Sequence, residues 1–139
     1  MSKTGSDLFK HTAGSNAALV KELKNSGVKC NSKDIVGITK TVNGQIVWLE
    51  NGNHAAGLAH IKAAHEVDFH NQGVSSEELA NFVMEAVHQG NIVGYQGKGK
   101  RARTVFEFVY EGKVRQVAVQ IASNGFIVGA NPKSMKGIN

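Results

Sequence analysis

The change in hydrophobic period at Gly90 constrains the fold of this chain more than any other feature. Before it, residues 75–90 are expected to form a helix, and one face of that helix carries Leu79, Phe82, Val83, Ala86 and Val87. Ser75 and Glu78 are spaced as a capping box at its start, and Gly90 stands at its C′ position. After Gly90, apolar and polar residues alternate, which is typical of half-buried strands.

The alternating part of the chain predicts a sheet. The expected strands cover residues 91–95, 103–110, 114–122 and 126–130, and Glu111-Gly112 makes a turn between two of them. Because several antiparallel strands follow the helices, the sequence predicts an α+β fold in which the helices pack on one face of the sheet.

The first half of the chain carries two more expected helices and a hairpin. A short amphipathic helix begins at Ser15 and ends at residues 25–27, Asn-Ser-Gly. Asn43-Gly44 joins residues 34–39 to residues 45–49 as a type I′ hairpin. Asn53 is expected to cap a helix over residues 54–69, whose apolar stripe is Leu58, Ile61, His65 and Phe69.

Charge and composition narrow the class of protein. The 139 residues fit one domain and carry a formal charge of +5, which suits a polyanionic partner but is also common in domains without one. The single Cys30 excludes an intrachain disulfide and a four-cysteine zinc site. No apolar run reaches the roughly 18 residues of a membrane span, so we expect no stable membrane association. The polar start, Met1 to Lys10, is not a signal peptide.

His60 and His65 lie on the expected helix over residues 54–69. Their spacing turns them roughly 140° apart around the axis, which is poor geometry for chelating one metal ion. His65 falls on the apolar stripe, so it is either a hydrogen-bonded core histidine or a proton-transfer group in a cleft between helix and sheet.

A cationic loop precedes the strand that begins at Arg103. Residues 97–103, Gly-Lys-Gly-Lys-Arg-Ala-Arg, hold Lys98, Lys100, Arg101 and Arg103. Such a loop can bend around a phosphate, or it can be an ordinary solvated hairpin loop. Arg103 and Thr104 start a strand and can therefore hold a fixed position at a sheet end.

The C-terminal part offers amide and hydroxyl groups at Ser123, Asn124, Asn131 and Ser134. These groups either close a polar hairpin or donate hydrogen bonds to phosphate or base edges. Cleavage of RNA by its own 2′-OH needs a base, an acid and positive charge on the phosphorane. His60, His65 and Arg103 could fill these roles, with Thr104 or Ser123 as an added donor. We find no residues spaced to hold a metal ion, so none is expected.

Three stretches of the chain resemble a known family. They are residues 46–53, Ile-Val-Trp-Leu-Glu-Asn-Gly-Asn; residues 56–61, Ala-Gly-Leu-Ala-His-Ile, with His65, Asp68 and Phe69; and residues 124–132, Asn-Gly-Phe-Ile-Val-Gly-Ala-Asn-Pro. Residues 94–99, Gly-Tyr-Gln-Gly-Lys-Gly, and Arg103 add to the likeness. Together they make about residues 33–134 similar to the C-terminal nuclease toxin domains of contact-dependent growth inhibition effectors, which are CdiA-type polymorphic toxins.

This resemblance implies a barnase/EndoU/colicin E5–D/RelE-like fold, with a helical half packed on a four- or five-stranded antiparallel sheet. It implies a metal-independent ribonuclease that cuts tRNA, needs no cofactor and is neutralised by a cognate immunity protein. Some similar toxins use translation elongation factor Tu as a helper. The family's helix histidine falls on His65 with His60 as its neighbour, the sheet-end arginine on Arg103 beside Thr104, and the polar tail on Ser123, Asn124, Asn131 and Ser134.

The same resemblance suggests how the chain is organised. Residues 1–32 would be an N-terminal lead-in with a short helix, and residues 33–139 the nuclease toxin domain. The chain would be the C-terminal part of a secreted or cell-surface effector, delivered to the target-cell cytoplasm. Two departures from the family stand out, since we expect a basic residue where Ala64 stands and a Tyr where Phe106 stands. Two other functions stay open, a non-catalytic RNA- or protein-binding module and a metal-dependent DNase toxin.

Overall fold

A computed structural model describes residues 10–133, apart from the side chain of Lys100. Its helices are α2 (Ala17–Asn25), α3 (Leu58–Asn71) and α4 (Leu79–Gln89), with short 3₁₀ turns η1 (Ser32–Asp34), η2 (Ser76–Glu78) and η3 (Gly99–Arg101). Its strands are β1 (Ile35–Lys40), β2 (Ile46–Glu50), β3 (Asn91–Gln96), β4 (Arg103–Tyr110), β5 (Lys113–Ile121) and β6 (Ile127–Lys133). The predicted α+β fold is therefore confirmed.

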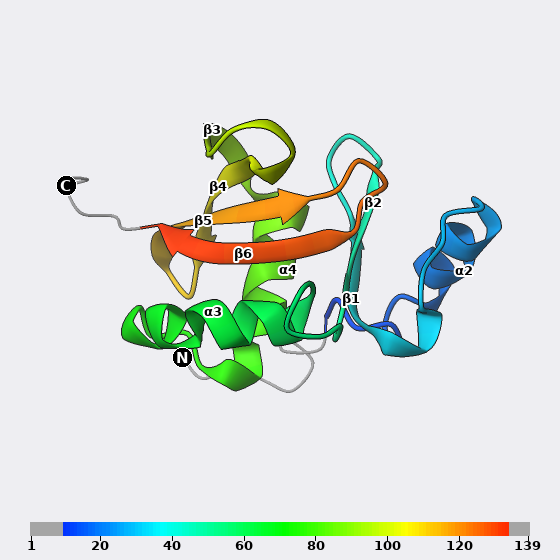
Figure 1. Cartoon of the computed structure of the whole chain (residues 1–139), viewed down its shortest axis with the longest axis horizontal. Coiled ribbons are helices and arrows are strands. Elements are labelled where there is room, and N and C mark those ends of the chain that lie inside the picture. The colour runs from blue at the N-terminus through cyan, green and yellow to red at the C-terminus, as the bar shows by residue number, and fades with distance from the viewer. Residues whose placement is uncertain (1–9, 134–139) are drawn as a thin grey trace.

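The strands form two antiparallel sheets that meet at one corner. The larger sheet has the order β3-β4-β5-β6, and the smaller is the hairpin β1-β2. The backbone N–H of Trp48 in β2 donates to the carbonyl of Gly125 at 3.0 Å, just before β6. In Figure 1, α3 runs alongside β6, while α4 stands behind the strands.

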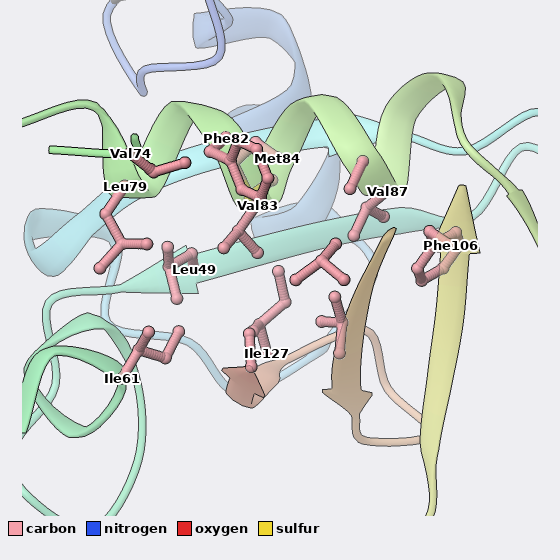
Figure 2. Close-up of a cluster of buried hydrophobic side chains, with 14 of the residues drawn as sticks. Leu49, Ile61, Val74, Leu79, Phe82, Val83, Met84, Val87, Phe106 and Ile127 are labelled. Carbon is pink, nitrogen blue, oxygen red and sulfur yellow. The ribbon is translucent and has the colours of Figure 1, made fainter. Parts of the chain in front are cut away.

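The main core lies between α4 and one face of the larger sheet. The cluster includes Val83, Met84 and Val87 of α4, Leu49 of β2 and Ile127 of β6 (Figure 2). The ring of Phe82 makes edge-to-face contacts with Phe69, Phe108 and Tyr110, at centroid distances of 5.8, 5.1 and 4.7 Å. Each such pair adds roughly 0.5–1.5 kcal/mol beyond burial alone. The helix after Ser75 and the strands after Gly90 therefore stabilise each other.

A second, smaller core holds the N-terminal segment on the hairpin. Leu23 of α2 is buried with Ile35, Ile38 and Trp48 of β1 and β2. The carbonyl of His11 also accepts a hydrogen bond from the backbone N–H of Ile38 at 2.7 Å. Residues 11–25, part of the expected lead-in, thus pack against the hairpin.

The expected start of α3 at His54, with Asn53 as its cap, is wrong. The Oδ1 atom of Asn53 accepts a hydrogen bond from the backbone N–H of Ala55 at 2.8 Å, which makes a turn instead. The helix begins only after Gly57, whose φ of 94° and tight approach to the carbonyl of Glu50 require glycine. The backbone N–H of Gly57 donates to the carbonyl of Val128 at 3.0 Å, which fixes the start of α3 beside β6.

The expected cap of α4 is also wrong in its mechanism. Ser75 makes no side-chain cap hydrogen bond, and residues 76–78 form η2 before the helix proper. The end of the helix at Gly90 is confirmed, but Gly90 has an extended backbone. A Cβ on Gly90 would lie 2.3 Å from the carbonyl oxygen of Ala86, so glycine allows the chain to pass directly from α4 into β3.

The last strand extends further than the expected residues 126–130. It runs through Asn131 and Pro132 to Lys133. Pro132 is tolerated because β6 is an edge strand of the larger sheet. Asn131, predicted in the polar tail, is therefore held in the sheet.

Candidate functional site

The candidate site lies on the outer face of the larger sheet, which we define as the face turned away from α4. Side chains alternate along β4, so Phe106, Phe108 and Tyr110 enter the core while Arg103 points the other way. Gln96 is paired directly with Arg103 in the sheet, and Asn131 stands on the same face of β6. The outer face thus collects polar side chains from three strands.

A hydrogen bond to Asn131 holds the guanidinium of Arg103 in place on the outer face. Its Nη1 donates to Oδ1 of Asn131 at 2.7 Å. The Nε2 of Gln96 donates to the same oxygen at 3.4 Å. The guanidinium is therefore tied to β6 through Asn131, and Gln96 of β3 donates to the same amide oxygen.

No carboxylate in the described part of the chain balances the charge of Arg103. Burial lowers the pKa of its guanidinium, yet an arginine side chain stays protonated in proteins. No carboxylate of residues 10–133 lies within ion-pair distance of it. Taking a cation partly out of water without a counter-ion costs free energy, which a bound anion would recover.

His60 of α3 meets Arg103 at Gly129 of β6. A Cβ placed on Gly129 would lie 3.1 Å from Nη2 of Arg103 and 3.5 Å from Nε2 of His60. Both nitrogens therefore lie within 3.5 Å of one point. A side chain at residue 129 would push them away, so glycine at this position allows the cation and the imidazole to share one small space.

The tautomer of His60 follows from its other nitrogen. Nδ1 lies 2.8 Å from the carbonyl oxygen of His54. Since a carbonyl only accepts hydrogen bonds, Nδ1 must carry the proton and donate it. In the neutral ring, Nε2 then keeps its lone pair and presents it at Gly129, as a general base requires.

His65 lies away from the point at Gly129 where His60 and Arg103 meet. Its Nδ1 lies 2.9 Å from Oδ2 of Asp68, and its side chain is half-buried, 28% exposed. Leu58, Ile61 and Phe69 of the predicted stripe are buried, which leaves His65 at the margin of that stripe. Five residues turn it roughly 140° from His60, so α3 brings only His60 to the arginine.

Thr104 and Ser123 lie away from Arg103, contrary to their grouping with it as added donors. Neighbouring residues of a strand point to opposite faces, so Thr104 projects to the inner side when Arg103 projects outward. Both Thr104 and Ser123 line a separate cavity of about 500 Å³ beside the tip of the β1–β2 hairpin.

The remaining predicted binding residues fall into three groups. Lys98 and Arg101 are exposed in and beside η3, next to the start of β4. Asn124 uses its Oδ1 to accept the backbone N–H of Phe126 at 3.1 Å, which makes it a turn residue. The side chain of Lys100 and all of Ser134 lie outside the described part of the chain.

Sequence reasoning missed two members of this site. Gln96 is the last residue of β3, and only the pairing of β3 with β4 places it opposite Arg103. Gly129 interrupts an apolar strand, which is a signal of close approach by another group. The carbonyl of His54, which sets the tautomer of His60, could not be read from side-chain identity.

Three further findings bear on the function. Among residues 10–133, no three His, Cys, Asp or Glu side chains gather closely enough to hold a metal ion. No described helix is long and apolar enough to cross a membrane. Neither a protein-family model nor a curated protein matches the chain, so its function must be inferred from its own side chains.

Proposed function

We propose that this chain is a metal-independent endoribonuclease whose active site is the outer face of the larger sheet. The observation that carries the proposal is the convergence of His60 Nε2 and Arg103 Nη2 at Gly129. A lone pair and an unpaired cation beside one small space suit a phosphodiester with an adjacent hydroxyl. RNA offers that hydroxyl and DNA does not, which is why we favour RNA as the substrate.

In the proposed reaction, Nε2 of His60 takes the proton of the 2′-OH, whose oxygen then attacks the adjacent phosphorus. Arg103, fixed by Asn131, stabilises the negative charge that builds on the phosphorane. The bond to the 5′-oxygen breaks and leaves a 2′,3′-cyclic phosphate. His65 is the candidate acid for the leaving oxygen, with its ring oriented by Asp68.

The biological setting is part of the same proposal and rests on the resemblance to growth-inhibition toxins. The substrate would be tRNA in target bacteria, with elongation factor Tu as a possible helper and an immunity protein as the neutralising partner. The positive charge of the chain and the exposed cations Lys98 and Arg101 support a polyanionic substrate. The chain would act in the target-cell cytoplasm as the C-terminal part of a larger effector.

The decisive experiment incubates the purified chain with total tRNA in EDTA, with and without elongation factor Tu and GTP. We expect discrete fragments that carry 2′,3′-cyclic phosphate ends. Intact tRNA in every lane, together with cleavage of DNA once a divalent metal is added, would overturn the proposal.

The separation of His60 from His65 favours a second candidate, a module that binds RNA without cutting it. In that case Arg103 would hold a backbone phosphate and His60 would only shape the site. RNA that is bound in a salt-sensitive way and recovered intact would support this candidate.

A further inference from the structure

The cavity lined by Thr104 and Ser123 has the size of a small-molecule site. Its volume is about 500 Å³, within the range of roughly 300–1,000 Å³ that ligand pockets occupy. Val87 of α4, Phe106 of β4 and Ile121 of β5 provide apolar walls. The rim is formed by the β1–β2 hairpin, the start of β3 and the segment after β5. The cavity can therefore hold a small, partly apolar group.

The polar groups of this cavity are uncharged. Among the described residues that line it there is no Lys, Arg, Asp, Glu or His, so none of these side chains can form an ion pair with a phosphate or an amine. Asn43, Asn91, Thr104 and Ser123 contribute amides and hydroxyls, and none of these side chains is hydrogen-bonded to another described residue. Apolar walls with free donors and acceptors suit a flat, uncharged ring that has hydrogen-bonding edges.

The cavity and the outer-face site lie at the same end of the larger sheet. Arg103 and Thr104 are neighbours in β4, one facing each side. Glu111 and Gly112 join β4 to β5 at the far end, so no loop joins these two strands at the Arg103 end. The loop of residues 97–102 and the connection of residues 122–126 flank this end, so an RNA strand with a phosphate at Arg103 would reach the cavity by passing between them.

An aromatic side chain stands beside the cavity. Tyr95 of β3 is paired with Thr104 in the sheet and is 72% exposed. An exposed aromatic ring offers a face on which a nucleic acid base can stack, worth roughly 1–3 kcal/mol per base. Lys98 and Arg101 follow in the loop that connects the same two strands.

We infer that this cavity binds an unpaired nucleobase. The inference rests on the proposed ribonuclease function for the origin of the base, which would be a nucleotide flanking the cleaved phosphate. The cavity would then supply base preference while Arg103 and His60 supply the chemistry. A free nucleoside carries the same ring, so binding of the ring can be measured without RNA cleavage.

The test titrates each of the four ribonucleosides into the full chain and follows backbone amide shifts by NMR. We expect one nucleoside to shift the amides of Asn43, Asn91 and Thr104. Thr104→Val keeps the shape of the side chain and removes its hydroxyl, so it should weaken binding about fivefold. Asn91→Ala should weaken binding similarly, and Asn71→Ala, an exposed asparagine at the end of α3, is the matched control.

Three outcomes separate this inference from the proposed function. Cleavage of tRNA without any nucleoside shift at the cavity would overturn the inference and leave the ribonuclease standing. Nucleoside binding at the cavity with no RNA cleavage would support the inference and overturn the proposed ribonuclease activity. Binding that Thr104→Val and Asn91→Ala leave unchanged would place the ring elsewhere and overturn the inference.

Discussion

The two faces of β4 differ in what they do with their side chains. On the inner face, Phe106, Phe108 and Tyr110 are buried against α4, and edge-to-face contacts join Phe82 to two of them. On the outer face, the guanidinium of Arg103 is held by Asn131 and has no described carboxylate partner. On its inner side β4 therefore stabilises the core, and on its outer side it presents the cation of Arg103 without a described carboxylate partner.

This contrast indicates where function should be sought. Side chains of the inner face satisfy one another, so changing them should cost stability first. Side chains of the outer face are positioned by hydrogen bonds but leave His60 Nε2 and Arg103 Nη2 available at Gly129. Variants of the outer face should therefore lose cleavage while they keep the fold, and the predictions below test that separation.

The largest effect is expected for Arg103→Ala. Loss of the cation that faces the phosphorane should lower the rate of tRNA cleavage about a thousandfold, the upper range for one positioned donor. Initial rates measured in EDTA check this, with thermal unfolding as the measure of fold. Arg101→Ala, which removes an exposed arginine from the neighbouring loop, is the matched control and should lower the rate only a few-fold. Equal losses in both variants would mean that the outer face has no special role.

His60→Ala should come next, with a loss of about a hundredfold or more for a missing general base. His65→Ala should cost less, because His65 is not at Gly129 and serves only as the candidate acid. Single-turnover cleavage of a tRNA substrate measures both. Full activity in His60→Ala together with loss in His65→Ala would make His65 the base and overturn the assignment to His60.

The helices and strands could be predicted from the sequence because an element with one buried face repeats its apolar residues at the spacing of a helix or of a strand. The stripe from Leu79 to Val87 and the alternation in residues 103–110 both reflect a single buried face, and both elements are confirmed. The start of α3 was not predictable in the same way. It depends on hydrogen bonds of Gly57 and Ala59 to the carbonyls of Val128 and Asn51, which local sequence does not reveal.

From the sequence, only the kinds of residue in the candidate site could be predicted, and not which of them lie together. His60 stood out on an expected helix, Arg103 at the start of an expected strand and Asn131 in the polar tail, but the sequence could not choose between His60 and His65. That choice depends on which helical face lies along β6, and on the space left by Gly129. The split of Thr104 from Arg103 follows from strand alternation and was within reach of the sequence alone.

A smaller effect is expected for Gly129→Ala. The added methyl would sit 3.1 Å from Arg103 Nη2 and 3.3 Å from His60 Cδ2, so both side chains must shift by a few tenths of an ångström. Misplaced catalytic groups should lower the cleavage rate about tenfold or more. Gly94→Ala is the matched control, because a Cβ on Gly94 of β3 meets nothing within 4 Å. Steady-state rates should fall in the first variant and stay unchanged in the second.

The smallest effect on cleavage is expected for Glu85→Gln, on the inner side of the molecule. Glu85 of α4 accepts from buried His11 at 2.8 Å and pairs with Lys10 at 3.2 Å, which ties the N-terminal segment to the core. The hydrogen bond from His11 is the main cause that lowers the pKa of Glu85 to about 2. Cleavage at pH 7 should stay unchanged, because Arg103 and His60 lie on the other face of the larger sheet.

The same variant should show a clear effect on stability that depends on pH. A carboxyl whose pKa is lowered by folding stabilises the protein above its ordinary pKa, and this contribution disappears as the pH falls toward about 2. Urea unfolding at pH 6 should therefore find Glu85→Gln less stable by roughly 2–3 kcal/mol, and the difference should shrink between pH 5 and about pH 2. Glu22→Gln, in the exposed pair with Lys40, is the control and should change stability by less than about 1 kcal/mol. If the stability difference between Glu85→Gln and the unchanged protein stays constant down to about pH 2, the ionisation of Glu85 does not hold the N-terminal segment. A loss of cleavage at pH 7 in the same variant would contradict the separation between the two faces.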